Sequence, residues 1–166
     1  MLPIFLTILL FYIIFVFFDL RLLVPYLGFG KDAIPQQIPH EVLEEIEKID
    51  KEATSNKEFL KRSYEYITSH FHGDRFKTIY QGFYAFRPLF SHKKGYLPCT
   101  LQNQLLRIML IKSGRFHSSD IQMKVTVVDF FIHQYMEVYV DNEWLSVDPW
   151  GKALGIPFGR HAFGIV

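Results

Sequence analysis

The spacing of the apolar residues changes at Gly114, and this change limits the folds open to the chain. Upstream, segments 42–49 and 59–71 carry apolar residues three and four positions apart, as on one face of an α-helix. Downstream, residues 121–127 alternate between apolar and polar side chains, which is typical of a half-buried strand. Helices followed by strands predict an α+β domain whose helices pack on an antiparallel sheet.

Two more strands are predicted after the first. Val138 and Val140 alternate with Glu137 and Tyr139, and a turn then leads into a strand around residues 145–147. Short connections of this kind predict a meander of at least three antiparallel strands.

Local signals give the ends of two helices. Ser55 and Glu58 have the spacing of a capping box, which predicts a helix of about four turns after residue 55. After Pro98, apolar residues follow one helical face up to Gly114, while Gln102 and its polar neighbours are expected on other faces. Cys99 therefore lies at a predicted helix N-terminus.

The segment 72–98 is aromatic, basic and rich in glycine and proline, which predicts a loop with short helices. Its aromatic side chains could cover the thiol, bind a partner or fill the core beneath the loop; the last is the commonest role. These side chains are Tyr80, Phe83, Tyr84, Phe86 and Phe90.

The N-terminus is strongly apolar. Leu2 to Phe18 is a run without a charged residue, and as a helix it would be about 26 Å long, close to the thickness of a bilayer core. We expect residues 1–20 to form a transmembrane anchor, residues 21–38 a juxtamembrane linker and residues 39–166 the folded domain. The alternative is a buried core helix. A single-pass membrane location follows, with the domain placed outside the cytoplasm.

Composition excludes several classes. The 166 residues have a formal charge of +1, from 18 basic and 17 acidic side chains, so no broad positive field favours nucleic acid. The single cysteine cannot form an internal disulfide, and no Cys and His residues have the spacing of a zinc site.

The cysteine has candidate partners on the predicted sheet. If Asp141 and Asn142 form a two-residue turn, Val140 pairs with Glu143, and His133 and Asp148 become diagonal neighbours on one face. A three-residue loop would place them on opposite faces; the polar turn residues favour the shorter one. A helix dipole and a histidine cation both favour the thiolate, so Cys99, His133 and Asp148 could act as nucleophile, base and orienting acid. Each residue alone has a more ordinary structural role.

Three stretches, "PCTLQNQLLRIMLIKSGR", "HQYMEVYVDNEW" and "WLSVDPW", resemble the transglutaminase-like superfamily, a branch of the papain-like cysteine enzymes. The resemblance covers about residues 57–150. It implies a papain-like core, the catalytic residues Cys99, His133 and Asp148, a thioester intermediate and no cofactor. The substrate would be a protein or peptide amide.

The chain departs from the family pattern in two places. Leu97 and Pro98 precede the cysteine where a small residue is usual, and Tyr135 replaces a common Trp. The side chain of the oxyanion site stays unassigned, since no spacing singles out Tyr80 or Gln81. Amine transfer, deamidation and peptide hydrolysis all remain open. The alternative from another class is a catalytically inactive interaction module of the same fold.

Overall fold

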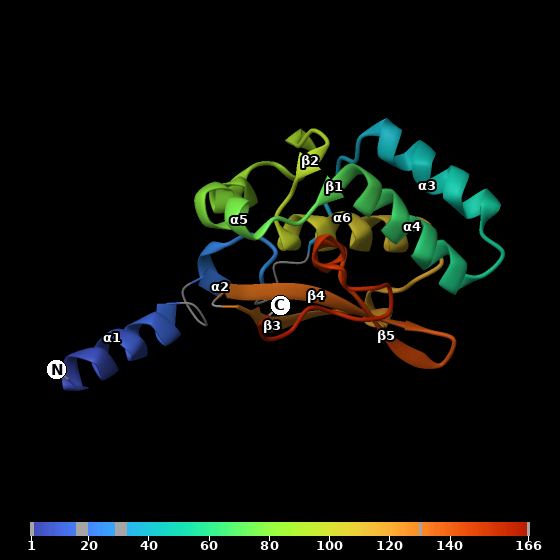
Figure 1. Cartoon of the computed structure of the whole chain (residues 1–166). Coiled ribbons are helices and arrows are strands. Elements are labelled where there is room, and N and C mark those ends of the chain that lie inside the picture. Colours follow the sequence, from blue (N-terminus) through green and yellow to red (C-terminus); the bar gives the residue numbers. More distant parts are fainter. Residues whose placement is uncertain (1, 16–19, 29–32, 130, 166) are drawn as a thin grey trace.

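A computed structural model describes residues 2–15, 20–28, 33–129 and 131–165. Helices α3 (His40–Glu52), α4 (Asn56–His70) and α6 (Cys99–Lys112) lie on one side of a three-stranded sheet (Figure 1). The strands are β3 (Ile121–Val128), β4 (Phe131–Val140) and β5 (Glu143–Val147). The α+β arrangement and the antiparallel sheet expected from the sequence are confirmed.

The sheet is an antiparallel meander in the order β3-β4-β5. Asp141 and Asn142 both have positive φ, 53° and 64°, as a two-residue type I′ turn requires. Val140 pairs with Glu143, and the ladder continues to the pair Met136 and Val147. The predicted register is therefore confirmed.

Helix α4 starts where the capping signal places it. The Ser55 hydroxyl accepts the Glu58 N–H at 3.1 Å. The carboxylate of Glu58 accepts the N–H of Thr54, one residue earlier than in a reciprocal capping box. This carboxylate also accepts hydrogen bonds from the Thr54 hydroxyl and from Arg62, and together these bonds lower the pKa of Glu58 to about 2.

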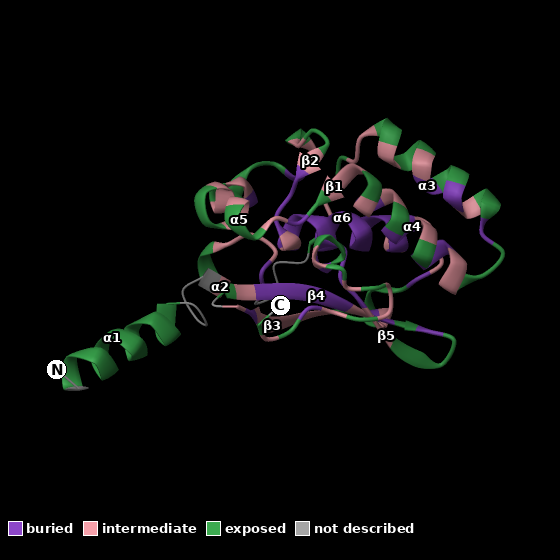
Figure 2. Ribbon diagram, in the orientation of Figure 1, coloured by how far each residue is buried: buried purple, intermediate pink, exposed green. Residues whose placement is uncertain are grey.

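Helix α6 is the central helix of the domain, and its residues 100–110 are all buried (Figure 2). It packs against α3 and α4 on one side and β4 on the other, so this part of the helix has no solvent-exposed face. The amide side chains expected on its other faces are buried as well, because each of them has an internal acceptor. Gln102, Asn103 and Gln104 donate to the carbonyls of Leu97, Gln134 and Ala33.

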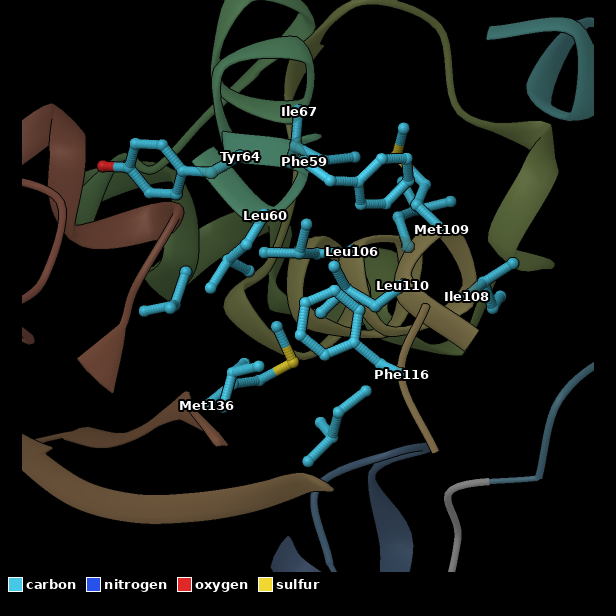
Figure 3. Close-up of a cluster of buried hydrophobic side chains, with 14 of the residues drawn as sticks. Phe59, Leu60, Tyr64, Ile67, Leu106, Ile108, Met109, Leu110, Phe116 and Met136 are labelled. Atoms are coloured by element: carbon cyan, nitrogen blue, oxygen red, sulfur yellow. The ribbon is translucent and has the colours of Figure 1, made fainter. Parts of the chain in front are cut away.

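The main core lies between α4, α6 and the sheet. Fully buried side chains from α4 and α6 meet Met136 of β4 and Phe116, which follows α6 (Figure 3). The α4 and α6 members labelled there are Phe59, Leu60, Tyr64, Ile67, Leu106, Ile108, Met109 and Leu110. This packing fixes α6 over β4. The first turns of α6 lie near His133 and Gln134 of that strand, since Asn103 donates to the Gln134 carbonyl and Cys99 lines the same pocket as His133.

The segment between α4 and α6 is folded as short elements. They are β1 (Phe71–His72), α5 (Arg75–Gln81), η2 (Gly82–Phe86), η3 (Leu89–Ser91) and β2 (Gly95–Tyr96), with β1 and β2 paired in parallel. Phe90 packs against the main core, but Tyr80, Phe83 and Phe86 are more than half exposed. For these three side chains, the expectation that the aromatics fill the core is wrong.

The expected transmembrane anchor is not found. Helix α1 (Leu2–Ile14) has 13 residues and a length of about 20 Å, whereas a span needs about 20 residues. None of the helices among the described residues reaches both the length and the apolar character that a membrane crossing requires. The single-pass location inferred from the apolar run is therefore not supported. Residues 16–19, part of the expected anchor, lie outside the described residues.

The segment predicted as a linker contacts the domain. Tyr26, Ile34 and Ile38 pack against the main core, and the Tyr26 carbonyl accepts a hydrogen bond from Gln134 of β4. Its helical part is α2 (Leu20–Leu23). Two further short elements, η4 (Ser118–Asp120) and η5 (Trp150–Leu154), complete the described structure.

Candidate active site

Cys99 is the first residue of α6. Pro98 precedes it in an extended conformation, φ −56° and ψ 150°, so the chain enters the helix without a side-chain cap. The Cys99 thiol is half-buried and faces the positive end of the helix dipole. Pro98 and the fully buried Leu97, which depart from the family pattern, therefore fit the turn that precedes the helix.

His133 lies in the middle of β4 and is 3% exposed. Its Nε2 atom is 2.8 Å from Oδ2 of Asp148, which follows β5 directly. The register of the hairpin makes the two residues diagonal neighbours on one face, as predicted. Since Nε2 is occupied, Nδ1 is the ring nitrogen available to the Cys99 thiol.

The carboxylate of Asp148 is held by backbone donors. Its Oδ1 accepts the N–H of Gly151 at 2.9 Å, and Oδ2 accepts the N–H of Ala162 at 2.9 Å as well as the His133 ring. A Cβ atom on Gly151 would lie 2.5 Å from Oδ2, so the close approach needs glycine at this position. The C-terminal segment thus helps to fix the orienting acid.

The environment of His133 favours the imidazolium. Burial is the largest single influence and lowers the pKa, but the hydrogen bond with Asp148, the interaction with the Cys99 side chain and the charges of both groups outweigh it. The net effect raises the pKa of His133 to about 10. A cation beside a thiol stabilises the thiolate. The structure therefore brings together all three residues singled out in the sequence.

Two of these three residues lie at a large pocket. Cys99 and His133 both line a cavity of about 590 Å³. Trp150 is a further wall residue, and its ring centroid lies 5.0 Å from that of His133. A Cβ on Gly73 would lie 2.5 Å from the Trp150 carbonyl oxygen, so a second glycine allows the chain to approach behind the site.

Two pocket residues beside Cys99 were not singled out in the sequence. Tyr96 is buried on β2, and its hydroxyl donates to Oγ1 of Thr78 at 3.2 Å; burial is the main reason that its pKa rises to about 12. Thr100, the second residue of α6, is buried, and its Oγ1 has no hydrogen-bond partner. The only sequence signal for Tyr96 and Thr100 is that they lie close to Cys99 in the chain. Tyr80 and Gln81 do not line the pocket.

Among the described residues, no group of three or more His, Cys, Asp or Glu side chains is placed to hold a metal ion. Comparisons with protein-family models, with curated proteins and with solved structures give no match to this chain.

Proposed function

We propose that the chain is a transglutaminase-like cysteine enzyme that acts on protein or peptide amides through a thioester on Cys99. One observation carries the proposal: the buried His133 ring is hydrogen-bonded to Asp148 and lines the same pocket as Cys99. A buried Cys alone is usually inert, but a cysteine at a helix start beside an imidazolium has the environment of a nucleophile.

The first half-reaction needs no group beyond these three. The Cys99 thiolate attacks the amide carbonyl carbon, forming a C–S bond and a tetrahedral oxyanion. When the intermediate collapses, the C–N bond breaks and His133 gives its proton to the departing amine. The Asp148 carboxylate holds the ring in position throughout and stabilises its positive charge.

The second half-reaction releases the acyl group. Water or a primary amine attacks the thioester, the neutral His133 ring takes the proton of the attacking group, and the C–S bond breaks to restore the thiolate. Water gives hydrolysis or deamidation, and an amine gives transfer.

The start of α6 suits the oxyanion. The backbone N–H of Cys99 is among the first N–H groups of α6, which have no acceptor within the helix, and the helix dipole favours negative charge there. This donor is supplied by the backbone and does not depend on an upstream Trp or Gln.

A second candidate, an inactive interaction module, is favoured by the aromatic side chains of Tyr80, Phe83 and Phe86. Each is more than half exposed, and exposed apolar clusters are typical of surfaces that bind other proteins.

Alkylation separates the two functions without a known substrate. Because the chain has one cysteine, the rate of iodoacetamide modification reports on Cys99 alone. At about pH 6 the wild type should react far faster than a free model thiol, and His133→Ala should slow the reaction. Rates equal to that of the model thiol in both proteins would favour the inactive module.

If the thiol is activated, a second assay identifies the reaction. Release of ammonia from glutamine peptides, measured with and without an added primary amine, separates transferase from hydrolase. Incorporation of the amine into the peptide indicates transfer.

A further inference from the structure

The pocket beside Cys99 is far larger than a single side chain needs. Its volume of about 590 Å³ is several times the roughly 150 Å³ of a cavity that accommodates one benzene molecule. It also lies within the range of about 300–1,000 Å³ that is usual for pockets binding drug-sized ligands. A group longer than one aromatic ring therefore fits.

The wall of this pocket is predominantly apolar. It includes Leu27 after α2, Ala85 and Phe86 of η2, Ile132 of β4 and Trp150. These residues come from segments that are distant in the sequence and converge at the start of α6.

The charged groups on the wall are already paired. Nη1 of Arg75 lies 3.1 Å from Oδ2 of Asp129. This ion pair joins the start of α5 to the end of β3. His133 is engaged with Asp148. Each charged side chain described on the wall therefore already has a partner of opposite charge, and none is left over for a charged substrate group.

The polar atoms suited to a reacting carbonyl lie at one place on the wall. They belong to Cys99, Thr100 and His133, which meet at the start of α6. Of the described buried side-chain atoms without a hydrogen-bond partner, only Thr100 Oγ1 belongs to a residue of this wall. Pockets that combine an apolar wall with a few polar groups orient their ligand through those groups.

We infer that this pocket accepts an extended apolar group, larger than one aromatic ring, attached to the carbonyl that Cys99 attacks. The inference rests on the proposed function for the reacting atom, whereas the apolar selectivity rests on the pocket itself. An aliphatic acyl chain and the apolar side chains of a peptide share this chemistry.

The test measures alkylation of Cys99 by iodoacetamides with N-linked ethyl, hexyl and dodecyl chains, and by iodoacetyl-Leu-Phe-amide. In each reaction the thiolate forms a C–S bond as iodide leaves, so only the apolar part differs. Burial of one methylene changes an affinity by about fourfold. The hexyl chain has four more methylenes than the ethyl chain. If the pocket buries all four, the hexyl reagent should react about 250-fold faster than the ethyl reagent, after division by the same ratio for a free thiol.

Variants locate the effect. Ala85→Phe fills the pocket and should abolish the gain, whereas Ala153→Phe, at an exposed position of η5, should preserve it. If Ala85→Phe does not fold, Phe86→Ala removes an exposed part of the wall and should reduce the gain several-fold. A larger gain with the alkyl reagents indicates an acyl chain, and a larger gain with the peptide reagent indicates peptide side chains.

The outcomes separate the two proposals. Fast reaction with iodoacetamide but no gain from any apolar group would overturn the pocket inference and leave the proposed function standing. Slow reaction with iodoacetamide would count against the proposed function. In that case the pocket is tested separately, by calorimetric titration of the Cys99→Ser variant with N-dodecylacetamide, which cannot react. If N-dodecylacetamide does not bind, the pocket inference is overturned.

Discussion

Nε2 of His133 lies 2.8 Å from Oδ2 of Asp148, although the two residues are not directly opposite each other in the sheet. Their contact depends on the two-residue turn at Asp141 and Asn142, because a register shift of one residue would put the side chains on opposite faces. The turn lies seven residues, or about 23 Å of strand, from Asp148, and it determines whether Cys99 has an oriented histidine.

Asp148→Asn should uncouple the histidine while keeping the side-chain shape. If the new asparagine side chain placed its NH2 group at the Oδ2 position, that group would face the Ala162 N–H and the His133 ring, from which Oδ2 now accepts hydrogen bonds. We expect the alkylation rate of Cys99 at about pH 6 to fall by about 100-fold or more. Asp141→Asn, an exposed position in the turn, is the matched control and should leave the rate unchanged. Equal rates in both variants would contradict an orienting role for Asp148.

His133 should remain protonated well above neutral pH. Its pKa is raised to about 10 from an ordinary value of 6.5, so the cation persists through pH 7 and is lost only as the pH approaches 10. Nuclear magnetic resonance of the labelled imidazole should show imidazolium shifts at pH 8. A titration midpoint near 6.5 would show that Asp148 and Cys99 do not stabilise the charge.

Gly151→Ala should displace the carboxylate of Asp148 and so disturb the site. The added methyl would lie 2.5 Å from Oδ2 of Asp148 and would displace the carboxylate from its backbone donors. We expect both a lower melting temperature and slower alkylation of Cys99. Gly82→Ala, where the methyl meets open space, is the control for stability. Equal melting temperatures for the two variants would argue against the close contact.

Ser55→Ala should lower stability without affecting the site. The hydroxyl caps α4 through the Glu58 N–H, and loss of such a cap costs about 1 kcal/mol. Urea denaturation should show this decrease while the alkylation rate stays at the wild-type value. A change in that rate would mean that the α4 cap is coupled to the active site.

The hairpin and the candidate triad could be predicted because local signals determined them. Alternation located the strands, Asp141 and Asn142 determined the turn, and a proline determined the start of the helix at Cys99. The contact between His133 and Asp148 follows by geometry from the strands and the turn.

The rest depended on tertiary packing. Gln102 and Asn103 could be placed away from the apolar face of α6, but their burial depends on acceptors outside the helix, the carbonyls of Leu97 and Gln134. The pocket is built from at least five separate segments, so no local sequence pattern predicts it. The apolar N-terminus suggested a span, yet its described helix ends at Ile14.

The central claim is that His133, oriented by Asp148, activates Cys99 as a nucleophile. Alkylation by iodoacetamide at about pH 6 measures this most directly, because Cys99 is the only cysteine of the chain. The wild type should react far faster than both His133→Ala and a free model thiol. Rates of the wild type and of His133→Ala that both equal the rate of the model thiol would contradict the claim.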